Sequence, residues 1–259
     1  MLNSLYIGAS GMHAQQLNID VVANNLANVN TNGYKRNRID FEDLLYRNVT
    51  KANGLIGSAD NIHRLGVGAA VTSTEKVFTF GDIKQTGGAL DFAIRGPGFF
   101  EVTLPDGSRG YTRSGAFAVN RDGLLTTSDG NLLTPSIQVP ADAASVSIDA
   151  NGHVFAKVPT ESQPVEIGQL ELANFMNPGG LNPLGNNLYV PTQKSGDAIS
   201  STPGENGLGT IAQGFLEASN VKLVEEMINL IVAQRAYEIN AKVVQASDEL
   251  LSISNNLRR

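Results

Sequence analysis

The chain has 259 residues, a length that suits one large domain or two ordinary ones. Its formal net charge is −6. No block of lysine or arginine occurs beyond the final pair, so neither nucleic acid nor an anionic membrane surface is expected as a main partner. Cysteine is absent, which excludes disulfides, zinc thiolate sites and cysteine nucleophiles. The first residues lack the basic and apolar regions of a cleavable signal, and no run of about 18 apolar residues could span a bilayer.

The N-terminal segment predicts an amphipathic helix over about residues 3–29. Its seam repeats in steps of four and three and is apolar except at Gln16: Leu5, Ala9, Met12, Gln16, Ile19, Ala23 and Leu26. Gly8 and Gly11 each cost a helix roughly 1 kcal/mol relative to alanine. We therefore expect this helix to be marginal by itself.

The helical pattern ends in residues 23–36, ANNLANVNTNGYKR. Asparagine side chains bond to nearby backbone groups, and both asparagine and glycine tolerate positive φ. We therefore expect a helix-stopping turn built by Asn24, Asn25, Asn28, Asn30 and Gly33. Residues 40–46, DFEDLLY, are expected to continue as a short helix. Residues 45–85 are expected to form an extended connector, whose part 50–66 projects as an arm towards a neighbouring subunit.

From residue 67 the apolar period changes to two, which indicates strands. Leu90, Phe92 and Ile94 alternate with other residues as in a half-buried strand. Asp-Gly or Asn-Gly pairs at residues 106–107, 122–123, 129–130 and 151–152 predict hairpin turns. Residues 86–214 are therefore expected to form an all-β domain.

Residues 220–257 predict a long helix, because neither proline nor glycine interrupts them, and Asn220 is the expected N-cap. Two apolar stripes run along opposite sides of this helix, and one partner cannot cover both. The first stripe contains Ile228, Val232, Ala236, Ile239, Val243, Ala246, Leu250, Ile253 and Leu257. The second is apolar except at Gln234 and Asp248 and contains Leu223, Met227, Leu230, Gln234, Tyr237, Ala241, Val244, Asp248 and Leu251. We expect the N-terminal helix to pair with the first stripe as a coiled coil, and a neighbouring subunit to cover the second.

The fold class is thus α+β. Residues 1–44 and 215–259 form one discontinuous helical domain around the β domain. Because the second stripe needs a neighbour, both termini are expected to be largely disordered until the subunit polymerises.

No constellation of catalytic or metal-binding residues is visible. His13, His63 and His153 are far apart in the sequence and lack neighbours suited to ligation. The Asp-Gly turns lack the spaced oxygen ligands and distal glutamate of a calcium loop. The glycine pairs do not continue into a phosphate-binding motif. We expect no catalytic residue, no cofactor and no metal.

Four stretches carry a resemblance to a known family. They are residues 23–36, LDFAIRGPGFFEV (90–102), YTRSGAFAVNRDGLL (111–125) and QGFLEASNVKLVEEMINLIVAQRAYEINAKVV (213–244). With the N-terminal heptads they resemble the bacterial flagellar rod and hook proteins over nearly the whole chain. The length, the GNNLYVPT stretch (185–192) and the connector resemble the distal rod members most. Hook proteins usually carry a further inserted domain.

The resemblance implies a structural subunit without enzymatic activity. Such a subunit self-assembles into the distal rod, which transmits torque from the motor to the hook. The implied partners are copies of itself in a helical homopolymer, proximal rod subunits, the hook protein, the surrounding ring bushing and the flagellar export apparatus. The implied location is the basal body, spanning the periplasm, after export without a cleaved signal peptide.

The residues expected to carry assembly are those of the helix seams: Leu5, Met12, Ile19, Leu26, Leu223, Met227, Leu230, Val232, Tyr237, Ile239, Val243, Val244, Leu250 and Leu251. Two alternatives stay open. One is another rod or hook component of the same family. The other is an enzyme or ligand-binding β domain that carries oligomerisation helices.

Overall fold

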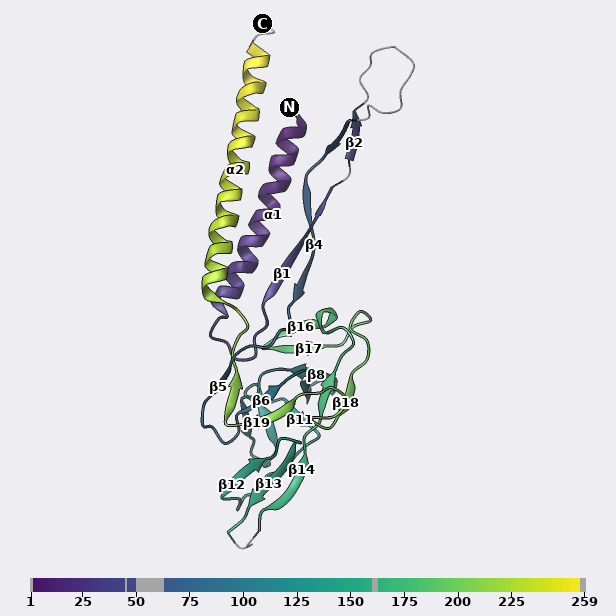
Figure 1. The fold of residues 1–259 in the computed structure, drawn as a ribbon, viewed down its shortest axis with the longest axis vertical. Coiled ribbons are helices and arrows are strands. Elements are labelled where there is room, and N and C mark those ends of the chain that lie inside the picture. Colours follow the sequence, from purple (N-terminus) through teal and green to yellow (C-terminus); the bar gives the residue numbers. More distant parts are fainter. Residues whose placement is uncertain (1, 45, 50–62, 160–162, 257–259) are drawn as a thin grey trace. The chain divides into compact units, whose positions relative to one another are not determined.

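The structure, a computed structural model, describes residues 2–44, 46–49, 63–159 and 163–256. It is α+β, as the sequence predicts: in chain order, helix α1 (Leu2–Ala27) precedes and helix α2 (Leu223–Asn256) follows a long series of short strands, coloured by residue number in Figure 1. The protein folds as two units. The helical unit contains Met1–Ala27, Asn37–Glu75 and Lys222–Arg259, and the β unit contains Asn28–Arg36 and Lys76–Val221.

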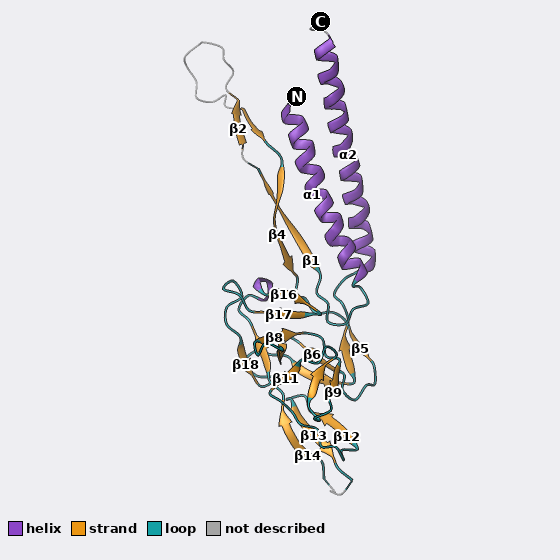
Figure 2. Ribbon diagram, turned by 180° about the vertical axis from the view of Figure 1, so that it is seen from behind, coloured by secondary structure: helices purple, strands orange, loops and turns teal. Residues whose placement is uncertain are grey.

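The helical unit consists of the two helices and a narrow β arm. α1 and α2 lie side by side in both views (Figures 1 and 2). In the arm, β1 (Asn37–Asp43) pairs with β4 (Ala69–Lys76), and β2 (Tyr46–Val49) pairs antiparallel with β3 (His63–Gly66). Most of the expected arm at residues 50–66 lies outside the described residues. Neither described helix is long and apolar enough to cross a membrane.

The short helix expected over residues 40–46 is wrong, because β1 occupies most of that stretch. β1 pairs with β4 along the arm and also lies against α1. Seven residues have little helix-forming capacity of their own, so pairing with a distant strand decides their conformation.

The β unit is built from short antiparallel strands. Its largest sheet has nine strands in the order β16-β17-β8-β7-β11-β10-β9, with β15 pairing both β7 and β18. β12, β13 and β14 form a second sheet, and β6 pairs with β19 and β5 with β20. The strand bounds are β5 (Ile83–Gln85), β6 (Phe92–Arg95), β7 (Phe99–Thr103), β8 (Arg109–Thr112), β9 (Phe117–Val119), β10 (Leu125–Thr127), β11 (Leu132–Thr134), β12 (Ser145–Ile148), β13 (His153–Lys157), β14 (Val165–Gln169), β15 (Leu172–Asn174), β16 (Asn182–Gly185), β17 (Leu188–Val190), β18 (Ile199–Ser201), β19 (Thr210–Gln213) and β20 (Phe215–Glu217).

The four turns predicted from Asp-Gly and Asn-Gly pairs are confirmed. Their glycines all have positive φ, between 79° and 85°, in the region that favours glycine: Gly107, Gly123, Gly130 and Gly152. Local turn chemistry therefore sets the hairpin positions along the β unit.

Strand β7 lies at the centre of the β unit and is buried on both faces. Phe100 belongs to a cluster that includes Phe92 and Leu172, whereas Phe99 belongs to a second cluster with Phe175 and Tyr189. Aromatic rings in the second cluster meet edge to face. The run FFEV is apolar except for Glu101, which is also buried and whose Oε1 lies 3.2 Å from Nη1 of Arg109.

Helix α2 begins three residues after the expected N-cap, so the assignment of Asn220 as a cap is wrong. The Asn220 Nδ2 donates to the carbonyl oxygens of Val77 (2.7 Å) and Thr79 (3.2 Å). Its Oδ1 accepts from the backbone N–H of Arg36 at 2.8 Å. The side chain joins three segments of the β unit instead of capping a helix.

Candidate assembly site

Helices α1 and α2 are in close contact at two glycines of α1. A β-carbon on Gly8 would lie 2.7 Å from Cγ2 of Val244, and one on Gly11 would lie 2.8 Å from Nδ2 of Asn240. Atoms in a packed interior do not approach so closely, so a β-carbon at either position would require Val244 or the Asn240 amide to move. The residues that weaken α1 in isolation therefore create the place where α2 fits.

The side of α2 that faces α1 is a heptad line of alternating character. Small or polar residues recur every seven positions: Glu226, Ala233, Asn240 and Ser247. Large residues recur between them: Leu230, Tyr237, Val244 and Leu251. Glu226, Ala233 and Ser247 are buried, and Nδ2 of Asn25 in α1 lies 3.4 Å from Oε2 of Glu226. The steps of three and four keep this line towards α1 along the helix.

The expectation that the first apolar stripe faces α1 is wrong. Six of its large side chains remain between 42% and 62% exposed: Ile228, Val232, Ile239, Val243, Leu250 and Ile253. We call these six residues the exposed stripe. Ranking faces by large apolar residues misled the prediction, because a close contact at Gly8 and Gly11 selects small or slender residues opposite them.

The seam residues predicted from the sequence fall into two settings. Half-buried are Leu5, Met12, Ile19 and Leu26 on α1, and Leu230, Val244 and Leu251 on α2. Exposed are Leu223, Met227, Val232, Tyr237, Ile239, Val243 and Leu250. The structure thus leaves more apolar surface on α2 than α1 covers.

Of the residues predicted to form the helix-stopping turn, Asn24 and Asn25 still lie within α1, which ends at Ala27, and only Asn28, Asn30 and Gly33 follow it. The backbone N–H of Thr31 donates to the Asn28 carbonyl oxygen at 3.1 Å. Gly33 has a φ of 73°, and its N–H donates to the Glu217 carbonyl oxygen at 2.8 Å. Asn24 and Asn30 are exposed. The turn therefore leads the chain onto the strand that ends at Glu217.

Asn25 has a different place from the other asparagines, because it is buried and contacts the start of β1. Its Nδ2 donates to the Asn37 carbonyl oxygen at 2.9 Å, and its Oδ1 accepts from the Asn37 N–H at 2.8 Å. This two-way pairing imitates a neighbouring strand. Asn25 therefore fixes where β1 begins.

A buried ion cluster, which the sequence analysis missed, lies in the β unit. Oε1 of Glu217 lies 2.6 Å from Nζ of Lys35, and its Oε2 lies 2.9 Å from Nε of Arg113. We call these three residues the Glu217 cluster; each is at most 4% exposed. Lys35 also donates to the Thr79 carbonyl oxygen at 2.7 Å, and the Gly81 N–H donates to Oε1 of Glu217 at 2.9 Å.

One carboxylate serves two cations in this cluster. Burial by itself raises the pKa of Glu217, but the charges of Arg113 and Lys35 outweigh it, and the pKa is lowered overall. Burial lowers the pKa of Lys35; Glu217 opposes this and Arg113 adds to it. Glu217 is therefore held ionised between two positive charges.

The described residues offer little for catalysis. They contain no group of three or more histidine, cysteine, aspartate or glutamate side chains placed to hold a metal ion. His153 pairs with Glu166 at 2.7 Å on the surface. The large exposed feature is instead the stripe on α2, which is typical of a protein that associates with other chains.

Three family models match the chain, and all describe flagellar axial proteins. Residues 5–35 match the flagella basal body rod protein model, and residues 93–156 match the D1 domain of the flagellar hook protein FlgE/F/G. Residues 212–257 match the C-terminal model of the flagellar basal body rod FlgEFG protein. Each matched segment contributes one member of the Glu217 cluster: Lys35, Arg113 and Glu217, respectively. The fold and these matches define a flagellar rod or hook protein.

Individual relatives narrow this class. The chain is 46% identical to the flagellar basal-body rod protein FlgG of Buchnera aphidicola subsp. Schizaphis graminum, over 97% of this chain and 98% of the relative. It is 43% identical to FlgG of Borreliella burgdorferi over the whole of both chains. Identity to the rod protein FlgF of Caulobacter vibrioides is lower, 34% over 96% of this chain and 95% of the relative. The chain belongs to the FlgG family of flagellar basal-body rod proteins, which are structural proteins and not enzymes.

Proposed function

We propose that this chain polymerises with copies of itself into the distal rod of the flagellar basal body, the shaft that carries torque from the motor to the hook. The observation that carries the proposal is the exposed stripe of α2. Burying a large apolar side chain contributes about 1.5–3 kcal/mol, so the six residues represent on the order of 10 kcal/mol. That is comparable with the whole stability of a typical domain, about 5–15 kcal/mol.

A helical polymer accounts for the positions of both apolar sides of α2. In the polymer, α1 and α2 of one subunit act as a coiled coil through the heptad line, and the exposed stripe packs on a neighbouring subunit. Such a contact joins different surfaces on the two copies, so it repeats without closing after two subunits. The connector at residues 45–85 reaches a neighbour as an arm and stiffens the shaft.

The same proposal includes the other partners of a distal rod. Proximal rod subunits lie at one end of the polymer and the hook protein at the other, with the ring bushing around it. The subunit passes through the flagellar export apparatus without a cleaved signal peptide and assembles across the periplasm. Its termini order fully only when neighbouring subunits cover α2.

Substitutions in the exposed stripe test the proposal. Val232→Asp and Ile239→Asp should prevent polymerisation of the purified chain, measured by sedimentation and electron microscopy, and leave circular dichroism of the β unit unchanged. Gln245→Asp is the matched control, because Gln245 is exposed on the same helix but lies outside the stripe. If either stripe variant formed filaments like those of the wild-type chain, the proposal would be contradicted. A wild-type chain that stops at a dimer would contradict it as well.

A further inference from the structure

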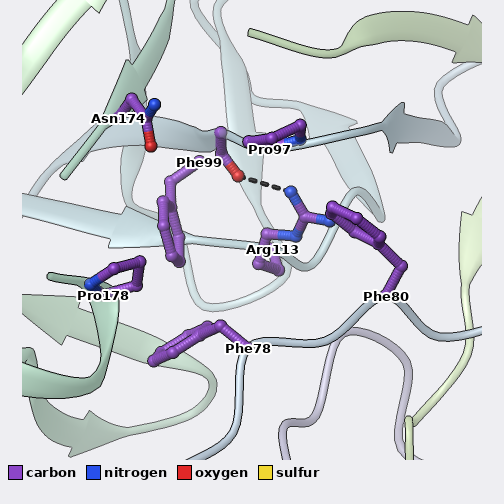
Figure 3. Close-up of a pocket in the computed structure, with 8 residues that line it drawn as sticks. Phe78, Phe80, Pro97, Phe99, Arg113, Asn174 and Pro178 are labelled. Atoms are coloured by element: carbon purple, nitrogen blue, oxygen red, sulfur yellow. Dashed lines mark hydrogen bonds between the residues drawn. The ribbon is translucent and has the colours of Figure 1, made fainter. Parts of the chain in front are cut away.

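A cavity of about 170 Å³ opens in the β unit beside Arg113 (Figure 3). Its walls are mostly rings: Phe78, Phe80, Phe99, Pro97 and Pro178. The volume exceeds that of a single water molecule, which occupies about 30 Å³ in the liquid. An apolar cavity with one charged group in its wall is a common form of binding site.

Arg113 has one donor group that no acceptor among the described residues reaches. Its Nε donates to Glu217, and its Nη1 donates to the carbonyl oxygens of Gly96 and Gly98. Its Nη2 is buried without a hydrogen-bond partner. In Figure 3 the guanidinium lies between the rings of Phe99 and Phe80. A buried donor without an acceptor is costly, so its position beside a cavity calls for an explanation.

The charge of the Glu217 cluster indicates what the cavity accepts. Lys35 and Arg113 carry two positive charges, and Glu217 carries one negative charge, so one positive charge in this cluster has no carboxylate. A neutral carbonyl group would accept a hydrogen bond from Nη2 but would leave the extra positive charge without a counterion. A carboxylate would satisfy both, and burial strengthens the attraction.

We propose that this cavity binds a carboxylate side chain of a second copy of the chain, carried on an apolar segment that contacts the aromatic walls. The choice of a second copy rests on the proposed polymer. It also fits the composition, since each copy has 25 acidic and 19 basic residues and so brings an excess of carboxylates. Phe80 is 57% exposed, so its ring can turn away from Nη2 without losing much burial.

Binding of a small carboxylate tests the site in the full-length chain. Phenylacetate should shift the Arg113 Nε–H resonance and bind at least tenfold more tightly than phenylacetamide, which has the same ring and no charge. Arg113→Lys should abolish binding, whereas Arg109→Lys, at an exposed arginine paired with Glu101, should not. Equal binding of acid and amide would overturn the charge argument, and no binding would overturn the site.

A second pair of variants keeps Arg113 in place. Phe80→Glu puts a carboxylate beside the guanidinium, whose Cζ lies 5.5 Å from the Phe80 ring centre. This variant should lose phenylacetate binding and melt at a higher temperature than Phe80→Gln, its neutral counterpart. Equal melting temperatures and equal binding would contradict a carboxylate site.

Polymerisation identifies the source of the carboxylate. Saturating phenylacetate should slow filament growth of the wild-type chain severalfold, and phenylacetamide should not. If phenylacetate binds at Arg113 and growth is unchanged, a second copy is not the occupant. If the chain forms no polymer without added ligand, both the proposed function and the assignment of a second copy as the occupant are overturned. The binding measurements then still decide whether the cavity is a carboxylate site.

Discussion

Gly8 of α1 lies so close to Val244 of α2 that a β-carbon would come within 2.7 Å of the valine Cγ2. The backbone oxygen of Asn240 would lie 3.5 Å from the same β-carbon. Valine is stiff at χ1 because it branches at the β-carbon, so its methyl group cannot easily turn aside. The contact therefore sets how closely the two helices pack.

We predict that Gly8→Ala destabilises the helical unit, although the same change stabilises an isolated helix by about 0.5–1 kcal/mol. The added methyl group must displace Val244 or push the helices apart. Gly8→Ala combined with Val244→Ala should recover most of the loss, because the second change removes the clashing methyl group. Thermal unfolding followed at helical wavelengths measures the double-mutant cycle. Additive effects of the two changes would contradict the contact.

The Glu217 cluster predicts an unequal response to removal of its members. Glu217→Gln leaves two buried cations without an anion and should cost about 3–5 kcal/mol. Lys35→Met leaves the Arg113–Glu217 pair balanced and should cost less, about 1–2 kcal/mol for the lost hydrogen bonds. Denaturant unfolding followed by tyrosine fluorescence compares the two variants. Equal losses would show that the charge balance of the cluster does not matter.

The same carboxylate predicts how stability depends on pH. Burial opposes ionisation of Glu217, but Arg113 and Lys35 prevail and lower its pKa below the ordinary 4.5. A lowered carboxyl pKa stabilises the fold above the ordinary value, and this contribution is lost as the pH falls through the folded-state pKa. Between about pH 5 and pH 3 the wild-type chain should therefore lose stability more steeply than Glu217→Gln. Parallel curves would contradict this assignment.

The helices and turns could be predicted because their signals are local. The end of α1 and the four Asp-Gly or Asn-Gly turns depend on residues a few positions apart. The Glu217 cluster has no such signal, because Lys35 is 182 residues and Arg113 is 104 residues from Glu217. In the sequence, the three residues are charged positions of the short segments YKR, YTR and FLE, and nothing in these segments indicates that they meet in the fold.

The side of α2 that faces α1 was missed for a different reason. Apolar periodicity identifies where large residues gather, and the largest gather on the exposed stripe. The α1-facing line contains Glu226, Asn240 and Ser247, which a search for apolar residues passes over. Their partners on α1 include Asn25 and the two glycines, so the contact combines small and polar groups. Only the packed structure shows that these residues lie opposite one another.

Two glycines with similar backbone conformations give the last prediction. Gly33 and Gly107 have φ values of 73° and 81°, so alanine is strained at either position by about 1–2 kcal/mol. A β-carbon on Gly33 would lie 2.7 Å from the backbone nitrogen of Ser114 and 2.9 Å from its Cα, whereas one on Gly107 would meet nothing within 4 Å. Backbone atoms cannot move aside as a side-chain tip can. Crowding should therefore destabilise Gly33→Ala by a further ~1–3 kcal/mol.

Gly33→Ala should therefore destabilise the β unit clearly more than Gly107→Ala, measured by denaturant unfolding of the two full-length variants under the same conditions. Because the Gly33 N–H donates to the Glu217 carbonyl oxygen, displacement of residue 33 should also disturb the strand that carries the Glu217 cluster. Gly33→Ala should then flatten the acid dependence of stability towards that of Glu217→Gln, and Gly107→Ala should leave it unchanged. If both alanine variants lose the same stability and keep the wild-type acid dependence, positive φ alone explains Gly33, and its approach to Ser114 has no part in the fold.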